Sequence, residues 1–293
     1  MKKAISMWAF PGEMDLASRI RRAGELGFEG IELCMAERGE FSLESSDAEV
    51  LALKKVADDA GVALGTVCSG LFFQHSLTSS RPDIRASAVR VVKKEIDFAA
   101  LVGAGVALVV PGIVGFDFGL REVIPDAEEG GYFAGDEVIQ YDVAWERSLA
   151  GLKELAPHAE AKGVVIGVEN IWGKFLLSPM EMRAFVDAAD SKWVQAYFDV
   201  GNCMLTGYPE HWIKILGPRL VAVHFKDFRR GSARPEGFVD LLAGDVDWAA
   251  VYEALKSVGF AGWITAEMTP IYKHFPDLTP AAASAALDRI LHK

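Results

Sequence analysis

Four short apolar runs in the second half of the chain each end on or near a residue that can bind a metal ion. The runs VVIGVEN, VQAYFDVGN, LVAVHFKD and GWITAEM carry, in that order, Glu169, Asp199, His224 and Glu267. Runs rich in Val, Ile, Ala, Phe and Tyr that follow helical patterns are typical of buried parallel strands. An ionised carboxylate in such a place is unfavourable unless it is paired or binds a cation. Three carboxylates and one imidazole in succession match the ligand set of a single divalent ion.

This set of donors predicts both a metal and a reaction. Carboxylate oxygens with one imidazole favour Mn²⁺ foremost, then Mg²⁺ or Co²⁺, with Zn²⁺ as a further option. Such an ion polarises a sugar carbonyl and stabilises an enediolate. Glu169 and Glu267 end the outer two of the four strands, so they can remove and return a proton on opposite faces of the neighbouring carbon. We therefore expect these two glutamates to be catalytic, in ketose epimerisation or in a 1,2 proton shift between ketose and aldose.

Strand and helix signals alternate along the whole chain, which favours an α/β fold, a (β/α)₈ TIM barrel in one domain over residues 1–293. An open doubly wound sheet is the alternative, but no GxGxxG follows the first strand. Residues 113–140 form a long acidic and aromatic insertion after the fourth strand, either a lid or an elaborated surface loop. The predicted strands are 3–8, 28–35, 62–69, 105–112, 164–170, 194–200, 220–227 and 262–268. The predicted helices are 15–27, 44–61, 85–103, 141–163, 178–190, 209–217, 247–259 and 279–293.

Composition excludes several classes of protein. The 293 residues are 51% hydrophobic and 24% charged, enough for a large core and without the bias of a disordered chain. A net charge of −11 argues against a nucleic-acid partner, although a local pocket for one phosphate is compatible with it. No apolar run reaches the roughly 20 residues that are needed to cross a bilayer. The N-terminal residues do not have the pattern that is expected of a signal peptide. With three scattered cysteines, we expect a cytoplasmic protein with no membrane partner.

Other residues are candidates for contact with a substrate. Strand alternation puts Lys226 on the same side as His224, where it could meet an anionic group or a carbonyl oxygen. Trp8, with Phe10, could form an apolar wall against a sugar, or be ordinary core. His75 lies in the loop after the third strand, where a hydroxyl contact competes with a solvated or helix-capping role. A basic cluster could hold a sugar phosphate or be merely solvated, and consists of Arg229, Arg230 and Arg234.

The segments VENIWGKFLLSP, YFDVGN, GYPEHWIKILG, VHFKDF and GDVDW resemble the sugar phosphate isomerase/epimerase superfamily, the xylose isomerase-like TIM barrels. Members include ketose 3-epimerases, hexulose-phosphate epimerases, inosose dehydratases and endonuclease IV. The resemblance covers nearly the whole chain. It implies that Glu32 faces the substrate pocket, where the residue could contact substrate or form a structural salt bridge. The resemblance implies further that Arg230 contacts substrate and that the protein forms a homo-oligomer, a dimer or tetramer. It also implies the same metal ligands and acid–base pair, namely Glu169, Asp199, His224 and Glu267 as ligands, with Glu169 and Glu267 as the pair.

One position departs from the superfamily pattern. Many relatives carry a His three residues after the aspartate of the sixth strand, and here that residue is Asn202. An amide still contacts a substrate hydroxyl, but it is a poor metal ligand and no acid or base near neutral pH. Because of this difference, the substrates of the 3-epimerases are a weaker guide to the substrate of this chain. With only six histidines and a net charge of −11, the difference also argues against a multi-zinc nuclease.

We therefore expect a divalent-metal-dependent isomerase or epimerase of a ketose or ketose phosphate. Its partner would be a small-molecule sugar or sugar phosphate. If a leaving group departs after proton abstraction, the same site would make a dehydratase of a keto-inositol or a lyase of a 3-keto-glycoside. A sugar-binding module without turnover is a further alternative, but it leaves the paired glutamates unexplained.

Overall fold

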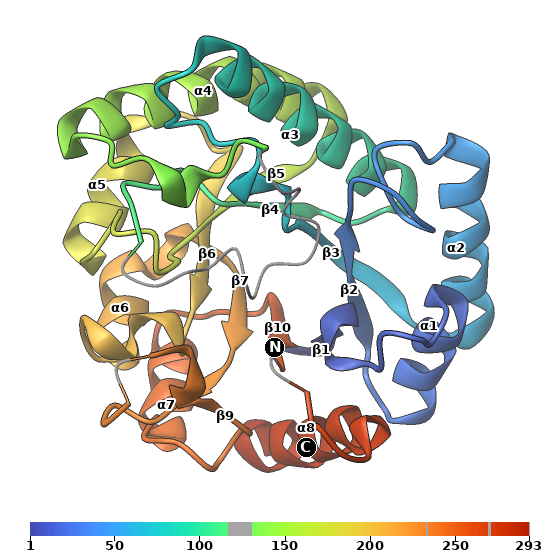
Figure 1. The fold of residues 1–293 in the computed structure, drawn as a ribbon. Helices are drawn as coiled ribbons and strands as arrows, with labels where there is room; N and C mark the ends of the chain where they lie inside the picture. The colour runs from blue at the N-terminus through green and yellow to red at the C-terminus, as the bar shows by residue number, and fades with distance from the viewer. Residues whose placement is uncertain (117–130, 233, 269–270, 293) are drawn as a thin grey trace.

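The chain forms a closed barrel of parallel strands in the order β1-β10-β7-β6-β5-β4-β3-β2. The computed structural model describes residues 1–116, 131–232, 234–268 and 271–292. Figure 1 looks into the barrel, with the helices forming an outer ring around the strands. The barrel strands are β1 (Lys2–Ser6), β2 (Gly30–Met35), β3 (Ala63–Ser69), β4 (Val106–Val109), β5 (Val165–Glu169), β6 (Val194–Asp199), β7 (Leu220–Phe225) and β10 (Trp263–Ala266).

The helices begin and end where local chemistry predicts. Ser46 and Ser178 each form a capping box with a glutamate at the start of a helix. Gly61 and Gly163 end two helices in the left-handed conformation, which glycine adopts without strain. The helices are α1 (Leu16–Glu25), α2 (Asp47–Ala60), α3 (Pro82–Val102), α4 (Tyr141–Lys162), α5 (Pro179–Ala188), α6 (Pro209–Leu216), α7 (Trp248–Ser257) and α8 (Thr279–Leu291). The predicted single-domain TIM barrel is confirmed, and the open-sheet alternative is wrong.

Strand alternation divides the buried side chains into two sets. One set faces outward and packs under the helices as the large core of the protein. The other set points into the barrel and forms a smaller cluster of Cys34, Cys68, Val106, Leu108, Tyr197 and Ala222. Polar residues on these inward-facing positions therefore meet one another at the carboxyl end of the barrel, where βα loops build active sites.

The structure adds a short hairpin that the sequence did not predict. After β7 ends at Phe225, the chain forms β8 (Asp227–Phe228), which pairs antiparallel with β9 (Phe238–Val239). Two-residue strands are too short to leave a periodic pattern in the sequence. The hairpin lies directly after the predicted metal-binding histidine and fixes the course of the chain beside it.

The predicted insertion at 113–140 is described only in part. Residues 117–130 lie outside the described residues, so the choice between a lid and a surface loop stays open. In the described part, Glu137 accepts hydrogen bonds from Tyr132 Oη and from the Ser80 backbone, which ties this segment to the start of α3.

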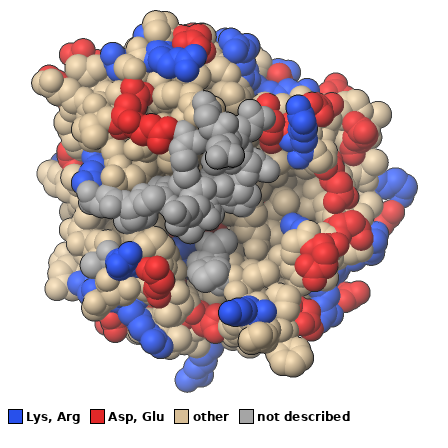
Figure 2. Space-filling view, viewed as in Figure 1, with Lys and Arg blue, Asp and Glu red and all other residues tan. Residues whose placement is uncertain are grey.

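The surface around the barrel mouth carries both signs of charge. Figure 2 shows acidic and basic side chains interspersed on this face. Among the helices that the structure describes, none combines the length and the apolar character that crossing a bilayer requires.

Candidate metal centre

The four predicted ligands come from four neighbouring strands. Glu169 and Asp199 are the last residues of β5 and β6, and His224 lies in β7 opposite Asp199 in the register. Glu267 follows β10, and its N–H donates to the carbonyl of Phe225 at 3.1 Å, so it continues the ladder. One potential ligand atom from each of the four residues lies within 4.8 Å of all the others.

The ring nitrogen Nδ1 of His224 lies at the centre of the carboxylates. It is 3.1 Å from Glu169 Oε1 and 3.1 Å from Glu267 Oε2. Asp199 Oδ2 is farther away, at 3.8 Å. All four side chains are buried. A nitrogen and three carboxylates that converge in this way could hold one metal ion.

The residues fit a divalent ion on two observations. Asp199 Oδ2 is buried and accepts no hydrogen bond from the described part of the chain, with the Lys226 ammonium at 3.4 Å and His224 Nδ1 at 3.8 Å. Buried carboxylate oxygens without hydrogen-bond donors are unfavourable unless a cation compensates them. The donor set of oxygens with one imidazole is also one that Mn²⁺, Mg²⁺, Co²⁺ and Zn²⁺ accept.

Asp199 is held so that one of its oxygens remains available. The side-chain amide of Asn170 accepts from the Asp199 N–H at 2.8 Å and donates to its carbonyl at 2.9 Å. The Asn202 N–H donates to Asp199 Oδ1 at 2.6 Å. Oδ1 is therefore occupied by the backbone, whereas Oδ2 turns toward His224.

Lys226 supplies a positive charge to the same cluster. Its Nζ lies 2.7 Å from Glu267 Oε2 and 3.4 Å from Asp199 Oδ2. The chain after β6 passes close by at Gly201, where an added Cβ would come within 2.7 Å of the Lys226 carbonyl. Glycine is thus required there by the close approach of two loops, which keeps Lys226 over the two carboxylates.

Burial and neighbouring charges give the carboxylates different proton affinities. Burial raises the pKa of Glu169 to about 7 and that of Asp199 to about 6, partly offset by nearby cations. Burial also acts on Glu267, but the charges of Lys226 and His224 outweigh it and hold the pKa of Glu267 below its usual range. In the metal-free protein, the two glutamates therefore hold protons with different strength.

Glu32 reaches the cluster from the other side of the barrel. Its carboxylate accepts from Thr66 Oγ1 and Tyr197 Oη, both at 2.8 Å, and lies 3.0 Å from His224 Nε2. The side chain is 0% exposed. Its position places Glu32 against His224, and its contact with a substrate stays a prediction.

The remaining predicted contact residues lie in different surroundings. Trp8, in η1 (Met7–Ala9), packs against the cluster inside the barrel. Asn202 donates through its side chain to the carbonyl of Asn170 at 3.0 Å, beside the candidate metal ligands. Within the described residues, His75 and Arg230 make no hydrogen bond or ion pair with the four ligands. His75 bonds to Ser87 at 2.9 Å and Arg230 to the Gly207 carbonyl at 3.1 Å.

Sequence reasoning missed several residues that hold the site in place. Asn170 follows Glu169 directly, and its polar side chain at a strand end was an available signal. Asp227 was missed as an anchor: its buried carboxylate accepts from the Leu242, Gly244 and Val246 N–H groups and from Trp248 Nε1. These bonds fasten the loop that leads from the hairpin into α7.

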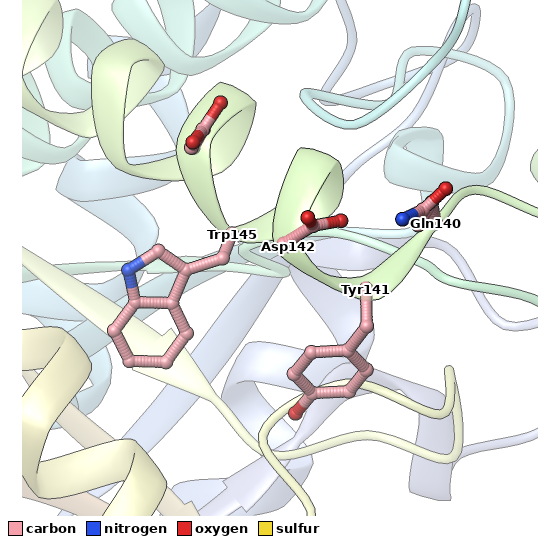
Figure 3. A pocket seen from close by; sticks show the side chains of 5 residues that line it. Gln140, Tyr141, Asp142 and Trp145 are labelled. Carbon is pink, nitrogen blue, oxygen red and sulfur yellow. The ribbon is translucent and has the colours of Figure 1, made fainter.

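A separate hollow lies on the outside of the barrel, at the start of α4. Figure 3 shows Tyr141 and Trp145 extending from the helix, with Gln140 and Asp142 beside them. Tyr141 Oη donates to Glu181 at 2.6 Å and accepts from the Leu176 N–H at 3.1 Å. The hollow is therefore built around a junction between α4 and α5, and none of the four metal-binding candidates lines it.

Comparisons with known proteins agree with this architecture. Residues 20–289 match the sequence profile of the family described as xylose isomerase-like TIM barrel. The chain is 26% identical over 263 residues to an L-ribulose-5-phosphate 3-epimerase, UlaE, of Shigella flexneri serotype 5b, covering 89% of this chain and 84% of the relative. A crystal structure of D-psicose 3-epimerase from Clostridium cellulolyticum H10 superposes with a TM-score of 0.80 at 20% identity, covering 100% of this chain and 99% of that one. The 3-keto-D-glucoside 4-epimerase YcjR of E. coli gives a TM-score of 0.73 at 16% identity, with both chains fully covered at 100%.

Proposed function

The chain belongs to the xylose isomerase-like TIM barrel family, and from this premise we propose that it is a divalent-metal-dependent epimerase or isomerase of a ketose or ketose phosphate. One observation carries the proposal. Glu169 and Glu267 extend from the outer two of four adjacent strands and approach the same His224 nitrogen, each at 3.1 Å. Two carboxylates that face one centre from opposite strands suit proton transfer on two faces of one carbon.

In the proposed reaction, one glutamate removes the proton from the carbon next to the substrate carbonyl. The C–H electron pair forms the C=C bond of an enediolate, and the proton stays on the carboxylate. The second glutamate then donates its own proton to the opposite face, which inverts that carbon. A bound divalent ion would polarise the carbonyl and compensate the negative charge that develops on the sugar oxygens. Mn²⁺ is the ion that we propose first.

Lys226 is the proposed contact for a substrate oxygen. Its ammonium lies beside Glu267 and Asp199 and is therefore close to the atoms at which negative charge would develop. Burial would lower the pKa of Lys226, but the Asp199, Glu267 and Glu169 carboxylates outweigh it and raise that pKa. Lys226 would therefore stay charged and act as an electrostatic group and not as a base.

Trp8 is the proposed apolar contact for a sugar, on the half of the barrel mouth away from the candidate metal ligands. It lies in η1, directly after β1, and packs against the apolar cluster inside the barrel, to which β2 contributes Cys34 and β3 contributes Cys68. The metal-binding half of the mouth would hold the polar edge of the sugar, and the apolar half would contact its carbon face. Glu32, Asn202, His75 and Arg230 remain predicted substrate contacts, with Asn202 beside the ligands and the last two farther out in the loops.

Product analysis tests the proposal. The protein would be incubated with Mn²⁺ or Mg²⁺ and, in separate reactions, L-ribulose 5-phosphate, D-psicose and a keto-inositol. We expect a product of unchanged mass that is a C3 epimer or an aldose. Loss of water from the keto-inositol would instead identify the dehydratase alternative. If none of these compounds reacts with either ion, this function is contradicted.

A further inference from the structure

We propose that Glu32 is a positioning residue that fixes the His224 ring, so that Nδ1 is the nitrogen that binds the metal ion. The inference goes beyond the proposed reaction, because it depends only on the metal centre and not on the sugar. It assigns a role to the one carboxylate of the cluster that lies outside the four ligands.

The surroundings of Glu32 support this role. The residue lies on β2, three strands away from β7 around the barrel, and reaches His224 through the interior. It has no exposed surface, and Thr66 and Tyr197 each donate a hydroxyl hydrogen to its Oε2 at 2.8 Å. Two hydroxyl donors, one from β3 and one from β6, thus hold the carboxylate in one orientation.

The two nitrogens of the His224 ring face different partners. Nε2 lies 3.0 Å from Glu32 Oε1 and 3.2 Å from its Oε2. Nδ1 faces Glu169 and Glu267, at 3.1 Å each. An ionised carboxylate can only accept hydrogen bonds, so Glu32 holds a hydrogen on Nε2, and in the metal-free protein a second hydrogen on Nδ1 faces Glu169 and Glu267. A bound cation would displace the hydrogen on Nδ1, because that nitrogen faces the other candidate ligands, whereas the hydrogen on Nε2 would stay with Glu32.

This arrangement is the one that orients histidine ligands in metalloproteins. A carboxylate that accepts from the distal ring nitrogen fixes both the tautomer and the ring orientation, and it makes the other nitrogen a better donor. Removing such a partner typically weakens metal binding by about 10- to 100-fold. Contact of Glu32 with a sugar would require displacing it from Thr66, Tyr197 and His224 together.

The first test observes the wild-type ring directly. Protein with ¹⁵N-labelled histidine would be loaded with Zn²⁺, which is diamagnetic, and the ring nitrogens would be observed by NMR. The chain has only six histidines, and a His224→Gln sample assigns the signal. We expect a hydrogen on Nε2 of His224 and none on Nδ1. A hydrogen on Nδ1 with the ion bound through Nε2 overturns the inference.

The second test compares two buried glutamates. Glu32→Gln keeps the size of the side chain and removes the charge that fixes Nε2–H, so we expect Mn²⁺ affinity to fall by about 10- to 100-fold. Glu95→Gln is the matched control, because Glu95 is also 0% exposed but has no hydrogen-bond partner among the described residues. Mn²⁺ affinity would be measured by EPR of the free ion, and thermal unfolding would show that each variant is folded.

The outcomes separate this inference from the proposed function. Equal Mn²⁺ affinity in wild type and Glu32→Gln overturns the role of Glu32, even if the protein epimerises a ketose. If Glu32→Gln binds Mn²⁺ more weakly than wild type and Glu95→Gln does not, the role of Glu32 is supported, even if no sugar reacts. Equal weakening in Glu95→Gln overturns it, because the loss would then follow from disturbing the core. A wild-type protein that binds neither Mn²⁺ nor Zn²⁺ overturns it together with the metal centre.

Discussion

The ammonium of Lys226 lies 2.7 Å from Oε2 of Glu267, and this contact makes the two glutamates of the site unequal. Glu169 has no ion pair with Lys226 at this distance within the described part of the chain. The charge of Lys226 is therefore placed against Glu267 and Asp199, where it partly replaces the cation that the carboxylates would bind.

Lys226→Met should destabilise the metal-free protein. The change keeps the length of the side chain but leaves buried carboxylates without their counterion, which is expected to lower the free energy of unfolding by about 3 kcal/mol. A bound ion compensates the same carboxylates, so the increase in Tm on adding Mn²⁺ should be larger than in wild type. Lys93→Met is the control, since Lys93 pairs with Glu154 on the surface. An unchanged Tm in metal-free Lys226→Met would contradict the role assigned to the ammonium.

Asn170→Asp should loosen Asp199. The change replaces the amide nitrogen that donates to the Asp199 carbonyl by an oxygen, so two acceptors would face each other. We expect a loss of about 1–3 kcal/mol of stability, as for a buried acceptor left unpaired. Mn²⁺ affinity should fall with it, about 10-fold or more. Urea unfolding and EPR titration measure the two effects. Gln195→Glu, at an amide near the surface, is the control and should change neither the stability nor the Mn²⁺ affinity. If Asn170→Asp binds Mn²⁺ as tightly as wild type, Asn170 does not position Asp199.

Glu95 should make stability fall as the pH rises. Burial, with a smaller effect of Glu32, raises the pKa of Glu95 well above its ordinary value of 4.5. The folded state therefore keeps a proton that the unfolded chain releases. The stability that this carboxyl contributes is complete below pH 4.5 and is lost as the pH rises toward its folded pKa.

Glu95→Gln removes this dependence. The variant should gain stability relative to wild type as the pH is raised from 5.5 to 8, which urea unfolding at several pH values would measure. Glu154→Gln, at an exposed ion pair, should change stability by less than about 1 kcal/mol throughout. A stability difference between Glu95→Gln and wild type that stays constant with pH would argue against a protonated Glu95.

The sequence predicted the barrel and the convergence of the four candidate ligands because both depend on local patterns. Strand alternation and strand ends place Glu169, Asp199 and His224 without any knowledge of distant contacts. The partner of Glu32 was not predictable in the same way, because it lies 192 residues away in the chain and is selected by closure of the barrel. The tight contact of Lys226 with Glu267 was also missed. Alternation gives the side on which Lys226 lies, but not the neighbour that its long side chain reaches.

Arg230 shows a second reason why a contact is hard to predict from the sequence. Its position shortly after the candidate metal-binding histidine suggested contact with substrate, but Arg230 lies in the turn that connects β8 to β9. The guanidinium of Arg230 lies over the Tyr208 ring, 4.4 Å from its centre, and donates to Gly207. Sequence distance from a ligand is a poor guide once a turn intervenes, so the role of Arg230 in substrate binding stays a prediction.

Hydrogen exchange at the substrate tests the two-base proposal most directly. Wild type, Glu169→Gln and Glu267→Gln would be incubated in D₂O with Mg²⁺ and each epimer of a ketose that reacts, with bound metal measured in every sample. We predict that wild type incorporates deuterium at the inverted carbon of both epimers. Each metal-loaded variant should lose epimerisation by about 10²- to 10⁴-fold. Each should still exchange the hydrogen of one epimer, and the two variants should act on different epimers. Epimerisation at the wild-type rate in either variant, or exchange of the same epimer by both, would contradict the account.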